Sequence, residues 1–263
     1  MSEAEILYTK TGKVAKIILN RPAKLNALNQ TLMQKLGEAF MDAEQDPEVG
    51  SILLTGAGDA FSSGGDLEML ERLNKCSAAE VYQIMRRDFE VVLKIYTIPK
   101  PLITVVNGMA LGGGCSLALL GDVILASDRA QFGMIFSRLN LGPDMGASFL
   151  LPRLVGLIRA KDLFYSGRVI SAEEAFSYGM VSEVCPHENL MAKAMKKAQE
   201  LALGTTQVIG IAKDLLNRST GGYEMASALD LEAKVQAILL NSQKTREAIQ
   251  AFLKKHKPES YNQ

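Results

Sequence analysis

The chain has 263 residues, enough to bury a substantial core in one large domain or in one domain with a small appendage. Lysine plus arginine and aspartate plus glutamate number 29 each, so the charge balance favours neither nucleic acid nor a membrane surface as a partner. The three cysteines lack metal-ligand spacing, and the amino terminus lacks a targeting signal. We therefore expect a cytoplasmic globular protein without a metal site.

The first half of the chain alternates short β-branched runs with amphipathic segments, which is typical of an α/β fold. Helical periodicity is clearest at residues 31–44 and 79–93. The predicted strands cover residues 14–19, 51–55, 102–106 and 123–125.

Beyond about residue 160 the strand signals nearly vanish and helical patterns follow one another. No repeat or proline-rich linker separates the two parts, so we expect them to pack together. The expected division is a core of residues 1–195 and a helical carboxyl-terminal region of residues 196–263. Helices are predicted at residues 172–178, 190–203, 207–217, 223–240 and 242–254.

Two glycine-rich turns follow predicted strands. The first reads FSSGGDL at residues 61–67, and the second reads NGMALGGGC at residues 107–115 and opens an apolar helix at residues 115–120. Glycine lets the backbone turn sharply and approach a ligand. Taken alone, each turn is more typical of a tight connection than of a catalytic pocket, and neither has the spacing of a dinucleotide or phosphate-binding loop.

A third feature is LNLGPDMGAS at residues 139–148, which carries Asp144 after a proline and before a helical pattern. Spacing alone favours a helix N-cap for this aspartate.

These three features, together with NRPAKLNAL at residues 20–28 and YSGR at residues 165–168, resemble the crotonase (enoyl-CoA hydratase/isomerase) family over nearly the whole chain. The resemblance implies a spiral of ββα units with a helical carboxyl-terminal trimerisation region, as a homotrimer or a dimer of trimers. It also implies an acyl-CoA thioester as substrate. Coenzyme A is then part of the substrate, and no separate cofactor is expected.

The resemblance also implies an oxyanion hole for the thioester carbonyl. Carried over by position, its two donors are the backbone N–H groups of Ser63 and Gly113. Two preorganised N–H groups stabilise the enolate oxygen that forms when a proton leaves the carbon beside a thioester.

The acid/base residues depart from the pattern of a hydratase in this family. Hydratases carry two glutamates at positions that here hold Ser116 and Phe136, neither of which can act as a base near neutral pH. Asp144 falls where the dienoyl-CoA, enoyl-CoA and ring-modified phenylacetyl-CoA isomerases place a carboxylate, and its neighbours Leu141 and Met145 should raise its pKa. We predict an acyl-CoA double-bond isomerase, with a hydratase and a noncatalytic acyl-CoA-binding subunit as alternatives.

Further binding positions follow from the same resemblance. Asp66 is compatible with ligand binding or with stabilising its turn, and Lys24 is compatible with coenzyme binding or with simple exposure. The terminal Phe252 and Lys255 either complete a neighbouring subunit's pocket or lie on a solvated helix. The predicted substrate-binding residues are Lys24, Leu25, Ala27, Ser63, Gly64, Gly65, Asp66, Leu67, Gly113, Phe252 and Lys255.

Overall fold

The structure is a computed structural model that describes residues 4–204, 206–219 and 224–255. By their internal contacts the residues form two units, Met1–Ile211 and Ala212–Gln263. The first unit holds all the described strands. It ends at Ile211, whereas the core expected from the sequence ended at residue 195. None of the helices in the described part is long and apolar enough to cross a membrane.

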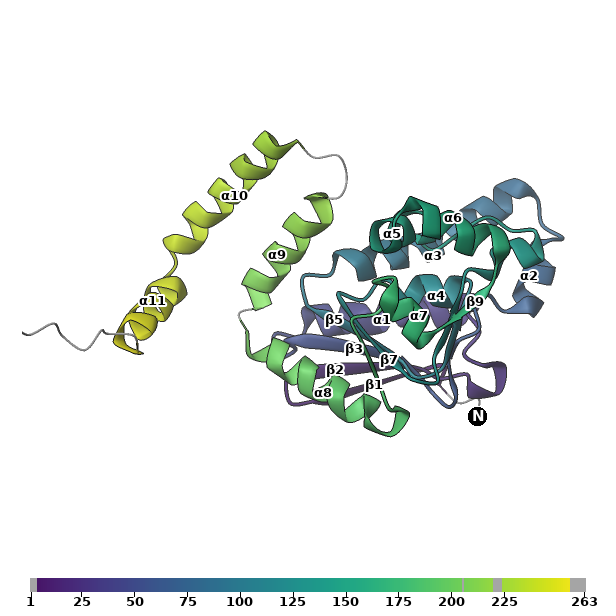
Figure 1. The fold of residues 1–263 in the computed structure, drawn as a ribbon, viewed down its shortest axis with the longest axis horizontal. Coiled ribbons are helices and arrows are strands. Elements are labelled where there is room, and N and C mark those ends of the chain that lie inside the picture. Colours follow the sequence, from purple (N-terminus) through teal and green to yellow (C-terminus); the bar gives the residue numbers. More distant parts are fainter. Residues whose placement is uncertain (1–3, 205, 220–223, 256–263) are drawn as a thin grey trace, which may run out of the picture. The chain divides into compact units, whose positions relative to one another are not determined.

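A six-stranded sheet forms the base of the first unit (Figure 1). β1 and β2 pair antiparallel as a hairpin, and the remaining neighbours are parallel. The four predicted strands are all present. β1 was missed because five of its six residues are exposed and it lacks an apolar face. In sheet order the strands are β1 (Ile6–Thr11), β2 (Val14–Leu19), β3 (Ser51–Gly56), β5 (Leu102–Val106), β7 (Val123–Ser127) and β10 (Glu183–Cys185).

A second sheet is built from strands of only three residues each. β4, β6 and β8 each follow closely on a strand of the large sheet, namely β3, β5 and β7, so the chain steps from one sheet to the other three times. A helical segment follows each step. This repetition is the predicted ββα spiral, which confirms the fold class. The small sheet has the order β4 (Ala60–Ser62), β6 (Met109–Leu111), β8 (Gln131–Gly133) and β9 (Val169–Ser171).

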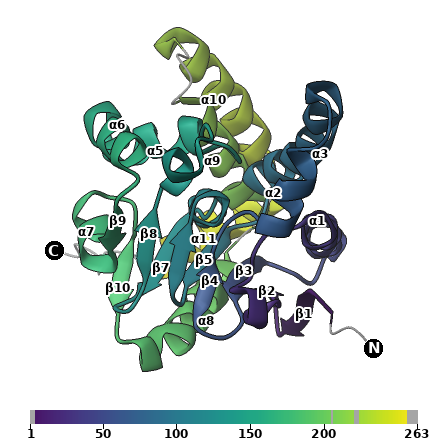
Figure 2. The ribbon, with the colours of Figure 1, turned by 90° about the vertical axis from the view of Figure 1, so that its right-hand side faces the viewer.

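Helices cover both sides of the large sheet. Figure 1 shows α8 below it and α3 to α6 above it, and in Figure 2 α6 lies at the upper left and α3 at the upper right, both above the strands. The predicted helices are present, although the helix expected at residues 115–120 begins at Gly113. The elements are η1 (Pro22–Lys24), α1 (Gln30–Gln45), α2 (Leu67–Leu73), α3 (Ala78–Thr97), α4 (Gly113–Ala118), η2 (Ile135–Leu139), α5 (Ala147–Val155), α6 (Leu157–Ser166), α7 (Ala172–Ser177) and α8 (His187–Leu203).

The carboxyl-terminal helices lie outside the sheets. α9 (Thr206–Ser219) crosses the boundary between the units, and the second unit contains α10 (Met225–Leu240) and α11 (Gln243–Lys255). The helix predicted from residue 223 begins at Met225, and Tyr223 itself lies outside the described residues.

The apolar core lies on both faces of the large sheet. The larger cluster includes Phe40, Phe61 and Phe132, each fully buried. On the opposite face, α8 presents a buried stripe at four-residue spacing, alanine at three of its four positions, which lets the helix pack closely on the strands. That stripe consists of Leu190, Ala194, Ala198 and Ala202.

The segment between β2 and α1 is held by a buried asparagine. Asn26 is fully buried with a φ of 55°, and its amide nitrogen donates to the carbonyls of Ala57 and Ala60 at 2.9 and 2.7 Å. Its side-chain oxygen accepts from the Arg21 N–H at 2.9 Å. One side chain therefore fixes this segment against the chain around β4.

We expect Asn26→Ala to lower the free energy of unfolding by about 2–4 kcal/mol, because three partly or fully buried backbone groups each lose a hydrogen bond. Denaturant unfolding measures this change. The matched control is Asn140→Ala, since Asn140 has a similar φ of 56° but is exposed, and its side chain makes no hydrogen bond to the described residues. Equal losses for both variants would contradict the role given to Asn26.

Candidate active site

The two glycine-rich turns meet where β4 and α4 approach each other. A Cβ added to Gly114 would lie 2.4 Å from the carbonyl oxygen of Ser62, and one added to Gly64 would lie 2.6 Å from that of Leu111. Gly64 also has a φ of 94°, a conformation that side chains strongly disfavour. The same added Cβ on Gly64 would lie 3.5 Å from the Gly113 nitrogen, so the second turn brings its first helical amide to the first turn.

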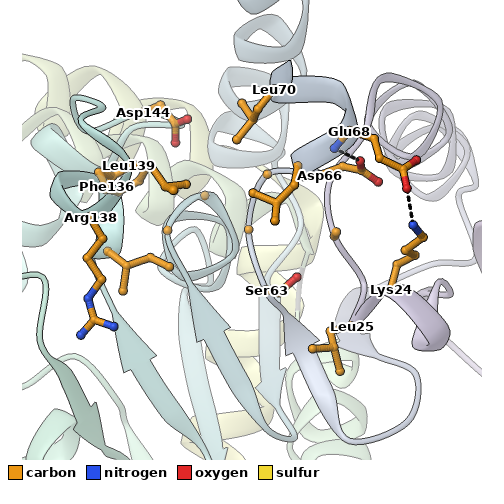
Figure 3. Close-up of a pocket in the computed structure, with 17 residues that line it drawn as sticks. Lys24, Leu25, Ser63, Asp66, Glu68, Leu70, Phe136, Arg138, Leu139 and Asp144 are labelled. Carbon is orange, nitrogen blue, oxygen red and sulfur yellow. Dashed lines mark hydrogen bonds and ion pairs between the residues drawn. The ribbon is translucent and has the colours of Figure 1, made fainter. Parts of the chain in front are cut away.

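A cavity of about 580 Å³ opens over these turns (Figure 3). Every predicted site residue before residue 150 lines it, so the structure brings together segments that are far apart in sequence. Figure 3 shows Asp144 on one side and the Lys24–Glu68 pair on the other. The lining residues are Lys24, Leu25, Ala27, Ser63, Gly64, Gly65, Asp66, Leu67, Glu68, Leu70, Gly112, Gly113, Ile135, Phe136, Arg138, Leu139 and Asp144.

The two carboxyl-terminal predictions fall elsewhere. Phe252 belongs to the second unit, where it is 64% exposed. The side chain of Lys255 lies outside the described part of the structure. A contribution of either residue to a neighbouring subunit's pocket stays a prediction.

The two predicted oxyanion donors differ in their hydrogen bonding. The Gly113 N–H has no acceptor among the described residues and stands at the start of α4. The Ser63 N–H instead donates to the Leu25 carbonyl at 2.9 Å. A ligand oxygen that binds the Ser63 N–H must therefore share it with the Leu25 carbonyl. The Gly113 N–H can donate to a ligand oxygen without such competition.

Asp144 lies directly against Gly113. Its Oδ1 would be 3.4 Å from a Cβ added to Gly113, and this oxygen is buried with no hydrogen-bond partner in the described part of the chain. The N-cap of α5 is Gly146, so the capping role that spacing favoured for Asp144 is wrong. Burial raises the pKa of Asp144 to about 6.

The backbone after Asp144 is constrained. Met145 adopts a φ of 48°, a left-handed conformation that is uncommon for a side chain of its size. Its sulfur would lie 3.1 Å from a Cβ on Gly113, so the buried Met145 and the carboxylate of Asp144 both lie against the same glycine.

No second carboxylate stands where a hydratase would carry one. Ser116 is fully buried, and its hydroxyl donates to the Gly112 carbonyl at 3.3 Å. Phe136 lines the cavity and stacks at a tilt on Phe164, with 6.0 Å between ring centroids. These positions thus supply an internal hydrogen bond and an apolar wall.

Asp66 stabilises its own turn. Its Oδ1 caps α2 by accepting from the N–H groups of Glu68 and Met69 at 3.0 and 3.2 Å. Its Oδ2 pairs with the Arg21 guanidinium at 2.9 Å. Although burial opposes ionisation of this carboxyl, these hydrogen bonds and the positive charge of Arg21 hold its pKa below the usual range. Asp66 therefore supports the cavity wall and is ionised at neutral pH.

Lys24 stands at the exposed rim of the cavity. Its ammonium group pairs with Glu68 at 2.6 Å, and both side chains are more than half exposed. A pair of this kind contributes little to stability, so a ligand phosphate can compete with Glu68 for the lysine.

Several cavity residues were missed by the sequence reasoning. Arg138 makes no ion pair with any described residue, and Leu139 follows it in η2. Leu70 enters from α2, one turn after Asp66. Leu70 could have been predicted, because it lies one helical turn after Asp66. Arg138 and Leu139 could not, because they lie in η2, a single short turn whose direction depends on the sheets. In the described part of the chain, no three His, Cys, Asp or Glu side chains form a metal-binding group.

The comparisons with known proteins agree with this geometry. The sequence model described as "Enoyl-CoA hydratase/isomerase" matches residues 9–263. The chain is 37% identical over 260 residues to 1,2-epoxyphenylacetyl-CoA isomerase of Escherichia coli strain K12, covering 98% of each. It is 33% identical over 258 residues to crotonyl-CoA hydratase of Syntrophomonas wolfei, again covering 98% of each. A crystal structure of an enoyl-CoA hydratase from Polaromonas sp. JS666 matches with a TM-score of 0.91 at 30% identity, covering 97% of this chain and 98% of that one.

The chain therefore belongs to the enoyl-CoA hydratase/isomerase family, which confirms the family and fold predicted from its motifs. It is an enzyme of the crotonase superfamily. One of these relatives is named an isomerase and another a hydratase, so they establish the family and not the particular reaction. The reaction has to be inferred from the residues of the site.

We expect Gly114→Ala to lower the free energy of unfolding by about 2–3 kcal/mol, because the new methyl group would overlap the backbone of Ser62. Gly142→Ala is the control, since a Cβ there meets nothing within 4 Å and its φ is not in the left-handed range. Thermal and denaturant unfolding compare the two. A Gly114→Ala variant as stable as Gly142→Ala would show that the turns are not in tight contact.

Proposed function

We propose that the protein is an acyl-CoA double-bond isomerase, which converts a 3-enoyl-CoA or a related ring-derived thioester to the 2-enoyl form. The observation that carries the proposal is one buried carboxylate, Asp144, beside the free Gly113 amide, with no second carboxylate at Ser116 or Phe136. Isomerisation moves one proton and needs one base. Water addition needs a positioned water and a second acid/base group.

Proton transfer at Asp144 is favoured by its environment. With a pKa near 6, a carboxylate is ionised at neutral pH and yet basic enough to accept a carbon-bound proton. In the proposed reaction Asp144 removes the proton from C2 of the 3-enoyl thioester and leaves a dienolate. The same carboxyl group then delivers the proton to C4, and the carboxylate is regenerated.

The dienolate oxygen carries the developing charge. The Gly113 N–H is the donor available to it, and Ser63 is the proposed second donor, which must share its N–H with the Leu25 carbonyl. Loss of one such donor typically lowers a rate by about 10²–10³. Asp144 lies close to Gly113. A thioester whose carbonyl oxygen accepts from the Gly113 N–H would therefore have its C2–H beside the Asp144 carboxylate, which supports the proposal.

The coenzyme end of the substrate is proposed to follow the exposed rim. Lys24 is cationic and weakly paired, and Arg138 offers a guanidinium across the cavity. A chain with equal numbers of positive and negative side chains attracts a polyanion only through such local groups. A homotrimer or a dimer of trimers, as the resemblance implied, remains part of the proposal.

Hydration is the second candidate. It is favoured by the hydratase names of several relatives, among them crotonyl-CoA hydratase of Syntrophomonas wolfei. In that case Asp144 would have to handle both the water and the carbon proton. Mass analysis of the product separates the candidates, because isomerisation leaves the mass unchanged and hydration adds a water.

We expect Asp144→Asn to lower the rate of 3-enoyl-CoA isomerisation by about 10²–10⁴, because an amide cannot accept the proton. The variant should remain folded. Its free energy of unfolding at pH 7 should rise by about 1–2 kcal/mol, because the raised pKa of Asp144 makes the fold lose stability as pH rises from about 4 to about 6.

The control is Asp59→Asn, which changes an exposed carboxylate outside the cavity. It should leave both the rate and the stability unchanged. A wild type that hydrates 2-enoyl-CoA and does not isomerise 3-enoyl-CoA would contradict the proposal, as would an Asp144→Asn variant with full activity.

The dependence of kcat/KM on pH should follow the ionisation of Asp144. The base form is lost as pH falls through about 6, so kcat/KM should drop about tenfold per unit below that value and level off above it. Initial rates at saturating and limiting substrate between about pH 5 and pH 8 test this. A profile that is flat across pH ~6 would exclude a base with this pKa.

A further inference from the structure

A fully buried serine, Ser62, lies behind the first glycine turn at the end of β4. Its side chain does not line the cavity. The hydroxyl group donates to the Asn26 carbonyl at 2.8 Å and accepts from the Gly64 N–H at 3.2 Å. A serine hydroxyl has one proton to donate, so these two bonds fix its direction. Ser62 thus ties the first glycine turn to the segment between β2 and α1.

The hydrogen bond from Gly64 to Ser62 encloses Ser63. A serine hydroxyl that accepts from the backbone N–H two residues later closes a small turn. The ring that it closes contains the planar peptide group between Ser62 and Ser63, and this peptide group carries the Ser63 N–H. The direction of the proposed second oxyanion donor therefore depends on the Ser62 hydroxyl.

The hydrogen bond from Ser62 to Asn26 acts on the other partner of this N–H. The Ser63 N–H donates to the carbonyl of Leu25, the residue directly before Asn26. Leu25 and Asn26 have φ values of 50° and 55°, a left-handed conformation that residues with a side chain seldom adopt. The bond to the Asn26 carbonyl restrains this segment beside Ser63. One hydroxyl group thus restrains both the donor and the acceptor that competes for it.

The helix that carries the other proposed donor packs directly against Ser62. A Cβ added to Gly114 would lie 2.7 Å from both the Cβ and the Oγ of Ser62. Neither the Asn26 carbonyl nor the Gly64 N–H has another hydrogen-bond partner among the described residues. Loss of the hydroxyl would leave two buried polar groups unpaired, which favours a rearrangement of the turn.

We propose that Ser62 is a positioning residue for the oxyanion site, which aligns the Ser63 N–H with the thioester carbonyl. The inference rests on the proposed function, because Ser63 acts as a donor only if a thioester binds at the glycine turns. Donors of this kind stabilise the dienolate more than they stabilise the bound substrate. Misalignment of Ser63 should therefore lower kcat and leave KM nearly unchanged.

The test compares Ser62→Ala with Ser51→Ala in the full-length chain. Ser51 is also fully buried, and its hydroxyl donates to the Ala198 carbonyl of α8 at 2.8 Å, away from the cavity. Both variants lose a buried hydroxyl, so both should unfold at a lower denaturant concentration than the wild type. Only Ser62→Ala should lower kcat for a 3-enoyl-CoA, by about tenfold or more.

A conservative variant keeps the test decisive if Ser62→Ala does not fold. Ser62→Cys has nearly the same shape, and its thiol is a weak donor and a weak acceptor. Its kcat should fall below that of the wild type, with KM again nearly unchanged.

A spectroscopic measurement separates the inference from the proposed reaction. Butanoyl-CoA with an isotope label at the carbonyl carbon has no double bond to move, so its carbonyl stretch reports hydrogen bonding at the glycine turns without turnover. We expect the stretch to shift to lower frequency on binding to the wild type and to Ser51→Ala. The shift should be smaller on binding to Ser62→Ala or Ser62→Cys, because the Ser63 N–H is misaligned.

An unchanged kcat or an unchanged carbonyl shift in the Ser62 variants would overturn the inference while leaving the proposed function intact. Equal losses of kcat in Ser62→Ala and Ser51→Ala would also overturn it, because general destabilisation would then explain both. If the wild type shows the carbonyl shift but moves no double bond, the isomerase proposal fails, and a smaller shift in the Ser62 variants would still support the inference. A wild type that shows neither would overturn both.

Discussion

The contact between the backbone of Ser62 and Gly114 is the constraint on which the site depends. Only a glycine lets α4 begin so close to β4, because an added Cβ would fall 2.4 Å from a carbonyl oxygen. This approach sets Gly64 beside the Gly113 nitrogen and leaves that N–H at the floor of the cavity. The two sheets supply the rigid frame, since β4 and β6 pair directly in parallel.

Burial of Asp144 lowers the stability of the fold and raises the basicity of the carboxylate. Its buried oxygen has no described partner, and both this oxygen and the sulfur of the left-handed Met145 lie against Gly113. The same burial that opposes its ionisation raises its basicity towards a carbon-bound proton. Ser116 and Phe136 supply no second carboxylate at this end of the cavity, which is the basis for proposing a transfer of one proton on a scaffold shared with hydratases.

The sequence predicted the features that depend on local periodicity and on motifs. The four apolar strands were readable because parallel strands covered on both faces are continuous apolar runs. The exposed β1 was not readable because it lacks an apolar face. The three-residue strands and the pairing of Arg21 with Asp66 were not readable because they depend on neighbours far apart in the chain. The hydrogen bond from Ser63 to Leu25 also required the fold, since it leaves no signal in residue spacing.

The central claim is that one carboxyl group removes and returns the same proton. Its most direct test is to incubate the enzyme with a 3-enoyl-CoA deuterated at C2 in ordinary water and to locate the label in the product by mass spectrometry and NMR. The account predicts a 2-enoyl-CoA that carries a measurable share of the deuterium at C4, because Asp144 delivers what it removed. A product with added water, or one in which no deuterium reaches C4, would contradict it.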